Sequence, residues 1–289
     1  MHTVPVETIR AGDLARYSFD VPPEEVNAVE DRTIDGPRGP LRIRIYRPNL
    51  KAENPVTVFF HGSGFVICSI ETHDAMCRSF CRRAATVVVS VDYALAPEKK
   101  FPAAPDDCFA ATKWVAAHAQ AFGADPARLA VAGDSAGGNM AAVVALRARD
   151  EGGPPLRAQV LIYPVTDHHS VQRPSYAERG GGCGLTREGM MWFWDLYLVD
   201  PSHGAHPHAS PIRAESLAHL PPAYIVTGEY DLLRDEGKDY ATKLQAAGVP
   251  VDLVHYDDMN HGFLNWVGLI DRSGQAMDGI CAWLRKALA

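Results

Sequence analysis

The chain has 289 residues, which is enough for one large α/β domain or two small ones. Its hydrophobic content of 47% and charged content of 22% are ordinary for a globular protein. The formal net charge is −7, without a long run of either sign, which argues against nucleic acid or an anionic membrane as a partner.

The N-terminal residues and the cysteines indicate the compartment. The first seven residues have neither a basic start nor an apolar core, so we expect no signal peptide, and no apolar stretch approaches the length that spans a membrane. The cysteines form no CxxC pair, so we expect reduced, mostly buried thiols and a cytoplasmic location. They are Cys68, Cys77, Cys81, Cys108, Cys183 and Cys281.

The predicted elements begin after a polar segment, residues 1–28, which has weak helical periodicity and no strand signal. It is interpreted as a short arm or part of a lid. Residues 32–34 and 41–47 then predict an antiparallel hairpin around a Gly- and Pro-rich turn, because apolar and charged residues alternate along the second strand. Further strands are predicted at 56–60, 86–91, 129–132, 158–163, 223–228 and 251–256. Helices are predicted at 73–84, 105–121, 136–149, 235–247 and 272–287.

Alternating strands and helices indicate one α/β domain with a mainly parallel sheet and helices on both faces. The alternation lapses between residues 165 and 212, which we interpret as an insertion covering one end of the sheet. Sites in such sheets lie outside the carboxyl ends of the strands, so residues that follow strands are the first candidates for chemistry.

The segment 133–137, Gly-Asp-Ser-Ala-Gly, lies between a predicted strand and a predicted helix. This is the context of the G-x-S-x-G nucleophile elbow, in which Ser135 stands clear of the sheet. Gly133 and Gly137 lack the Cβ atoms that would collide in so tight a turn, and the amide of Ala136 can face a developing oxyanion. A glycine-rich turn without chemistry is the alternative.

A serine nucleophile needs a base and a carboxylate that orients it. His261 follows the last predicted strand, and Asp231 follows the strand before it. The order Ser135, Asp231, His261 is the order found in α/β-hydrolases, which favours these roles over a surface histidine and a helix-capping acid. Other carboxylates near these positions are Glu229, Asp235, Glu236, Asp257 and Asp258.

Residues 61–64, His-Gly-Ser-Gly, follow an early strand, and their small side chains leave amides free to donate to a substrate oxygen. A structural turn is the alternative. His61 is interpreted as a residue that holds this loop rather than as a second base.

Five motifs together resemble the bacterial hormone-sensitive-lipase family of esterases (family IV). They are His-Gly-Ser-Gly-Phe at 61–65, Asp-Tyr-Ala-Leu-Ala-Pro-Glu at 92–98, Gly-Asp-Ser-Ala-Gly-Gly at 133–138, Asp-Leu-Leu-Arg-Asp-Glu-Gly at 231–237 and His-Gly-Phe at 261–263. The resemblance runs from about residue 32 to the C-terminus. It implies an α/β-hydrolase fold with a small helical cap, and hydrolysis of short-chain carboxylic esters through an acyl-enzyme.

The resemblance also implies the roles of individual residues. Ser135 is then the nucleophile, His261 the base and Asp231 its partner, while the amides of Ser63, Gly64 and Ala136 form the oxyanion hole. Where the family usually has His-Gly-Gly-Gly, this chain has Ser63 at the second glycine. If that position needs a positive φ, the hole is strained or displaced. If it does not, the hydroxyl adds a polar contact.

By the same resemblance, residues 1–28 and 165–212 form the cap, and residues 29–164 with 213–289 form the catalytic domain. The apolar stretch 190–194 lies in the insertion, and Met190 and Trp194 are the substrate-binding candidates, with simple packing as the alternative. His203, His206 and His208 lie in a Pro-rich loop without metal-ligand spacing, so no metal is predicted.

The predicted function is therefore a carboxylesterase that needs no cofactor, acts on a small-molecule ester and can form a homodimer. Two alternatives stay open. One is an amidase or specialised deacetylase with the same machinery. The other is a non-catalytic small-molecule receptor on this fold, for which a broken triad would be typical.

Overall fold

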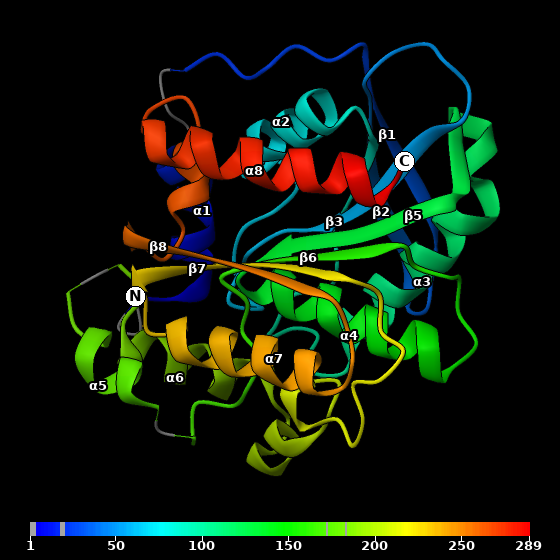
Figure 1. The fold of residues 1–289 in the computed structure, drawn as a ribbon. Coiled ribbons are helices and arrows are strands. Elements are labelled where there is room, and N and C mark those ends of the chain that lie inside the picture. Colours follow the sequence, from blue (N-terminus) through cyan, green and yellow to red (C-terminus); the bar gives the residue numbers. More distant parts are fainter. Residues whose placement is uncertain (1–3, 18–20, 172, 183) are drawn as a thin grey trace.

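The computed structural model describes residues 4–17, 21–171, 173–182 and 184–289. Its centre is an eight-stranded sheet with the order β1-β2-β4-β3-β5-β6-β7-β8 (Figure 1). The strands are β1 (Ala28–Gly36), β2 (Gly39–Arg47), β3 (Asn54–Phe60), β4 (Val87–Val91), β5 (Ala124–Asp134), β6 (Ala158–Ile162), β7 (Ala223–Tyr230) and β8 (Val251–Asn260).

The sheet is mostly parallel, as the sequence predicts. β1 pairs antiparallel with β2, and β2 pairs antiparallel with β4, whereas every pairing from β4 through β8 is parallel. Because β3, β5, β6, β7 and β8 run parallel to one another, their carboxyl ends lie at the same edge of the sheet. The loops that carry Ser135, Asp231 and His261 lie at that edge.

Helices cover both faces of the sheet. In Figure 1, α2 and α8 lie on one face, and α3, α4 and α7 lie on the other. Their bounds are α2 (Asp74–Ala84), α3 (Ala103–His118), α4 (Ala136–Asp150), α7 (Arg234–Ala246) and α8 (Asp271–Ala287). The helix predicted at 105–121 is α3 followed by a short 3-10 turn, η1 (Ala119–Phe122).

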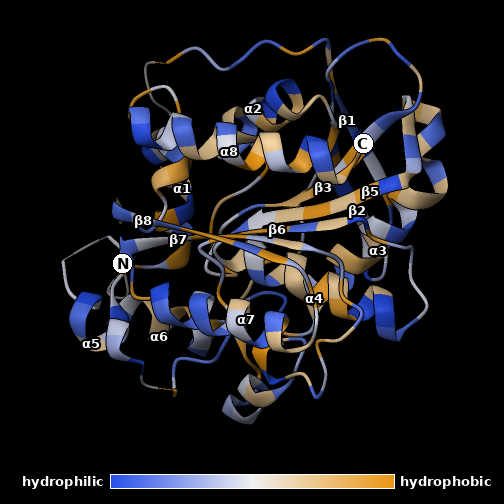
Figure 2. Cartoon of the chain, viewed as in Figure 1, coloured by the Kyte–Doolittle hydropathy of each residue, from blue (hydrophilic) through white to orange (hydrophobic). Residues whose placement is uncertain are grey.

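The central strands are apolar along their whole length because helices cover both of their sides. β4 and β6 are buried at every position, and β4 is composed of four valines and one serine. Figure 2 shows this as hydrophobic colour along the middle of the sheet, with hydrophilic colour on the outer sides of the helices. The apolar runs in the sequence therefore predicted these strands correctly.

Two segments lie outside the α/β alternation and sit together at the carboxyl end of the strands (Figure 1). The first contains α1 (Val6–Tyr17), a regular helix in the segment that the sequence analysis interpreted only as an arm or lid. The second connects β6 to β7 and contains α5 (Pro174–Arg179), α6 (Arg187–Tyr197), η2 (Pro201–Ala205) and η3 (Pro211–Arg213).

The described cysteines are buried, and Cys77, Cys81, Cys108 and Cys281 among them are free; the fifth is Cys68. The prediction for Cys183 concerns a residue outside the described ranges. The signal-peptide prediction rests partly on residues 1–3, which also lie outside them.

Candidate active site

Ser135 occupies the turn between β5 and α4, as the G-x-S-x-G pattern predicts. Its backbone adopts φ 55° and ψ −119°, a conformation that L residues rarely adopt and that packing must hold in place. A Cβ atom on Gly137 would overlap the carbonyl oxygen of Phe60, and one on Gly133 would overlap the backbone of Gly137. Both glycines are therefore required by the close approach of the elbow to the end of β3.

The structure brings Ser135, His261 and Asp231 together from three different loops. His261 Nε2 lies 2.9 Å from Ser135 Oγ, and His261 Nδ1 lies 2.7 Å from Asp231 Oδ2. Asp231 is buried, and its second oxygen accepts a hydrogen bond from the Leu233 amide at 2.9 Å. With both carboxylate oxygens engaged, Asp231 is fixed in the orientation that holds the imidazole toward Ser135.

The loop after β3 and the first residue of α4 both lie beside Ser135. Among the described residues, no hydrogen bond uses the amide N–H of Ser63, Gly64 or Ala136. In contrast, the amide of Gly62 is engaged, because it donates to Asp134 Oδ1 at 2.7 Å. The three free donors are those that the sequence analysis assigned to the oxyanion hole.

Ser63 does not have a positive φ, unlike Gly64, whose φ is +54°. Of the two alternatives for the serine that replaces glycine, the structure therefore shows the unstrained one. The Ser63 hydroxyl lies 2.6 Å from the hydroxyl of Tyr93, so it also makes the additional polar contact.

Buried titratable groups surround the loop 61–65. Burial acts to raise the pKa of Asp134, but His73, whose Nε2 lies 3.3 Å from Asp134 Oδ1, and the Gly62 amide outweigh it, and the pKa of Asp134 is lowered. Burial, with the neighbouring His73, lowers the pKa of His61 to about 3. His61 is therefore neutral at physiological pH and packs against Tyr93, with ring centroids 4.5 Å apart.

A cavity of about 350 Å³ opens at Ser135. One wall of the cavity comes mainly from α6, where Met190 and Phe193 lie one turn apart. A Cβ on Gly64 would lie 2.5 Å from the Phe193 ring, so this ring packs directly against the loop 61–65. The other lining residues are Arg16, Gly62, Ser63, Gly64, Ile67, Cys68, His73, Asp134, Ser135, Gly184, Leu185, Thr186, Gly189, Asn260, His261, Gly262, Asn265 and Trp266.

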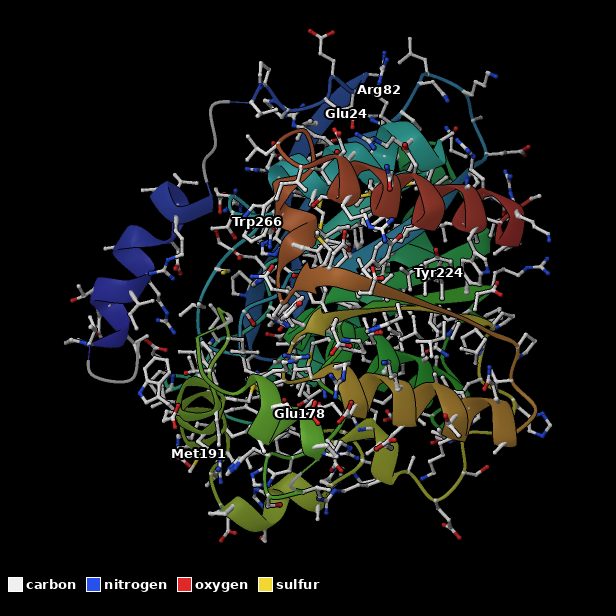
Figure 3. The ribbon with its side chains drawn as sticks, turned by 60° about the vertical axis from the view of Figure 1, so that its left-hand side comes forward. Glu24, Arg82, Glu178, Met191, Tyr224 and Trp266 are labelled. Atoms are coloured by element: carbon white, nitrogen blue, oxygen red, sulfur yellow. The ribbon has the colours of Figure 1, made fainter. Side chains whose placement is uncertain are left out.

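The two substrate-binding candidates differ in their positions. Met190 lines the cavity, whereas Trp194 is fully buried and packs against Phe65 and His168 outside it. Met191, the residue after Met190, is 39% exposed. In Figure 3 its side chain lies at the surface, on the same side of the molecule as α1. Helical periodicity thus separates neighbouring apolar residues into cavity wall, core and surface.

The loop that carries Asp231 is attached to α5. Ser175 donates through its hydroxyl to the carbonyl of Leu232 at 2.7 Å and through its amide to Asp235 at 2.8 Å. Glu236, fully buried at the start of α7, accepts from the Thr166 amide at 2.8 Å and lies 3.2 Å from the Tyr176 hydroxyl. The connection after β6 therefore helps to fix the loop that carries Asp231.

Sequence reasoning assigned no role to Asp134 or Tyr93, and it treated Phe193 only as one of the apolar residues 190–194 that could supply surface near the substrate pocket, without making it a substrate-binding candidate. Asp134 precedes the nucleophile, and Tyr93 belongs to the segment 92–98. Their contacts are with residues 62 and 63, which are distant in the chain, so no local pattern indicates them. Phe193 is at i+3 from Met190, and this helical spacing is the signal that could have identified it.

Within the described ranges, no group of three or more His, Cys, Asp or Glu side chains is placed to hold a metal ion. The helices found in those ranges also include none that is long and apolar enough to cross a membrane.

Known proteins share this fold and much of this sequence. A family described as alpha/beta hydrolase fold matches residues 57–265. The chain is 45% identical over 277 residues to the esterase LipI of Mycobacterium tuberculosis, covering 93% of this chain and 86% of LipI. It is 42% identical over 266 residues to the carboxylesterase NlhH of the same species, covering 90% and 83% of the two chains.

Solved esterase structures superpose on the whole chain. An esterase from Pyrobaculum calidifontis gives a TM-score of 0.94 at 42% identity, covering all of this chain and 95% of the other. The carboxylesterase EstE1 from a metagenomic library gives 0.95 at 41% identity, covering all of this chain and 99% of the other. On the evidence of these matches, the chain belongs to the hormone-sensitive-lipase family of esterases within the α/β-hydrolase superfamily.

Proposed function

We propose that this protein is a carboxylesterase that hydrolyses short-chain carboxylic esters, with Ser135 as nucleophile, His261 as general base and Asp231 as the residue that orients His261. The observation that carries the proposal is the hydrogen-bonded series Asp231–His261–Ser135, at 2.7 and 2.9 Å, beside three amide donors that the described residues leave free. Its relatives with esterase names support the reaction class.

In the acylation step, His261 Nε2 takes the proton of Ser135 Oγ while this oxygen attacks the ester carbonyl carbon. The carbonyl π electrons move onto the oxygen, and the amides of Ser63, Gly64 and Ala136 donate hydrogen bonds to the resulting oxyanion. When the tetrahedral intermediate collapses, the carbon–alkoxy bond breaks, and the imidazolium returns its proton to the leaving alcohol.

In the deacylation step, His261 takes a proton from a water molecule whose oxygen attacks the acyl carbon. The second oxyanion uses the same donors. The bond between the acyl carbon and Ser135 Oγ then breaks, Ser135 regains its proton from His261, and the acid leaves. Neither step uses a metal or an organic cofactor.

The size of the cavity supports a short substrate. Its volume of about 350 Å³ lies near the lower end of the roughly 300–1,000 Å³ usual for small-molecule sites. Met190 and Phe193 close one side of it. A long acyl chain would have to displace these side chains or leave the cavity for solvent.

We also propose that residues 1–28 and 165–212 act as the cap, with residues 29–164 and 213–289 as the catalytic domain. Arg16 of α1 and residues of α6 line the cavity, which supports a role for both segments in enclosing substrate. Met190 is the substrate-binding residue that we retain from the sequence, and Phe193 is added to it.

A cytoplasmic location and a homodimer are further proposals. Four free, buried thiols, those of Cys77, Cys81, Cys108 and Cys281, suit a reducing compartment. Light scattering on the purified protein, at several concentrations, tests the dimer.

The test of the function is hydrolysis of p-nitrophenyl acetate, butyrate and laurate by the wild type and by Ser135→Ala. We expect activity to fall from acetate or butyrate to laurate, and Ser135→Ala to lose roughly 10⁴-fold or more. Activity that survives Ser135→Ala overturns the nucleophile, and an inactive but folded wild type that binds esters favours a receptor. A matched p-nitroanilide, cleaved as fast as the ester, would favour an amidase.

A further inference from the structure

We propose that the hydroxyl groups of Ser63 and Tyr93 position the oxyanion hole, acting through the backbone of the loop 61–65. The inference rests on the proposed esterase function, because it concerns the donors that this function uses. Tyr93 comes from the loop after β4 and is not adjacent to the oxyanion loop in the sequence. Ser63 contributes twice: its amide as a donor to substrate, and its hydroxyl as a group that fixes the loop.

The hydrogen bonds of these groups run in one direction. Tyr93 donates its hydroxyl proton to the carbonyl of His61 at 2.6 Å, so the phenolic oxygen is left to accept from the Ser63 hydroxyl at 2.6 Å. The Ser63 oxygen in turn accepts from the amide of Phe65 at 2.8 Å. The Tyr93 hydroxyl and the Ser63 hydroxyl thus each donate one hydrogen bond, which fixes the orientation of both O–H groups.

The series joins the loop at residues 61, 63 and 65 to one rigid side chain. Tyr93 is 2% exposed, and its ring is stacked on His61 at an interplanar angle of 15°. Ser63 is 4% exposed, so bulk water cannot readily replace either partner. Burial raises the pKa of Tyr93 well above its ordinary value, so its hydroxyl remains a donor at alkaline pH.

The remaining groups of the loop are held by other contacts. The Gly62 amide donates to Asp134, the Ser63 carbonyl accepts from the Val66 and Ile67 amides at 3.0 and 2.9 Å, and the Phe65 carbonyl accepts from Ala96 at 2.9 Å. Between these contacts lie the amides of Ser63 and Gly64. The hydroxyl series thus fixes the loop on both sides of the two donors, where a glycine at position 63 would have no hydroxyl to do so.

The test compares Ser63→Ala, Ser63→Gly and Tyr93→Phe with the wild type. Ser63→Ala removes only the hydroxyl, because the φ of Ser63 already suits alanine, and Ser63→Gly removes the hydroxyl and frees the backbone. The matched control is Ser210→Ala, which deletes a buried hydroxyl that donates to the Gly204 carbonyl at 2.7 Å, away from this loop. For each protein we measure kcat and KM on p-nitrophenyl butyrate, thermal unfolding, and Ki for two ketones.

The ketones separate positioning from folding. An alkyl trifluoromethyl ketone forms a hemiketal with Ser135 that places an oxyanion in the hole, whereas the corresponding methyl ketone reports ground-state binding. We expect kcat to fall roughly tenfold in Ser63→Ala and further in Ser63→Gly, with KM nearly unchanged. The Ki of the trifluoromethyl ketone should rise by a similar factor, and that of the methyl ketone should not.

Tyr93→Phe should resemble Ser63→Ala, and the double variant should lose less than the product of the two single effects, because both break one series. The positioning role is overturned if Ser63→Ala has the same kcat as the wild type. It is also overturned if Ser210→Ala loses as much thermal stability as Ser63→Ala and its kcat falls by the same factor. An inactive wild type instead contradicts the esterase function itself, so the two failures are distinguishable.

Discussion

Asp231 Oδ2 lies 2.7 Å from His261 Nδ1, on the ring nitrogen opposite the one that faces Ser135. This contact fixes both the orientation and the tautomer of the imidazole, because Nδ1 must carry a proton to donate to the carboxylate. His261 can then accept a proton only at Nε2, which lies 2.9 Å from Ser135 Oγ.

Asp231→Asn is expected to lower kcat by roughly 10³- to 10⁴-fold, because an amide NH₂ in place of Oδ2 favours the wrong tautomer of His261. The measurement is kcat on p-nitrophenyl acetate. Asp257→Asn is the control, since Asp257 is 82% exposed and paired with Arg272. A loss of similar size in both variants would contradict the assignment of the acid.

Gly137→Ala is expected to destabilise the protein by about 4 kcal/mol or more, because the new Cβ overlaps the carbonyl oxygen of Phe60 and neither backbone can move freely. Gly274→Ala, in α8, meets nothing within 4 Å and should stabilise by about 0.5–1 kcal/mol. Chemical denaturation of the two variants tests the pair. Equal stability would show that the elbow can relax.

Phe193→Ala is expected to shift the chain-length preference toward longer esters. Removing the ring opens the cavity beside Met190, and each additional buried methylene contributes about 0.8 kcal/mol. We expect the laurate-to-acetate ratio of kcat/KM to rise roughly tenfold. Trp192→Ala, the adjacent aromatic residue, which is absent from the described cavity lining, should leave this ratio near that of the wild type.

Glu236 makes stability depend on pH. Burial raises its pKa from 4.5 to about 8, despite the opposing hydrogen bond from the Thr166 amide and the charge of Arg173. The folded protein therefore retains a proton that the unfolded chain releases, so this group's contribution falls as pH rises from about 4.5 to about 8 and is fully lost above that.

Glu236→Gln removes this dependence, because the neutral amide has no proton to lose, its oxygen can still accept from the Thr166 amide, and its NH₂ can donate to the Tyr176 hydroxyl oxygen, which is the donor in the wild type. Relative to the wild type, the variant should gain stability on going from pH 5 to pH 9, by at most about 5 kcal/mol. Unfolding in urea across this range measures the difference. Glu178→Gln, at a half-exposed glutamate paired with Arg234, is the control. A constant difference between Glu236→Gln and the wild type would contradict the raised pKa.

The parts of the fold that were predictable depend on local patterns. The valines of β4, the alternation in β2 and the glycines of the elbow constrain their own neighbourhoods, so they indicated strands and turns correctly. The helix α1 was less evident, because its weak amphipathic pattern gives no strong periodicity and its attachment comes from tertiary contacts. Arg10, for example, donates to the carbonyl of Val66 at 2.8 Å, a contact across 56 residues.

The sequence by itself determined the order of strands and helices, the turn at Ser135 and the chain order of the three candidate triad residues, because these depend on spacing and local conformation. Only the tertiary structure decided which carboxylate meets His261, that Ser63 avoids a positive φ, and that Phe193 rather than Trp194 lines the cavity. Such contacts depend on distances between segments far apart in the chain, which local patterns do not specify.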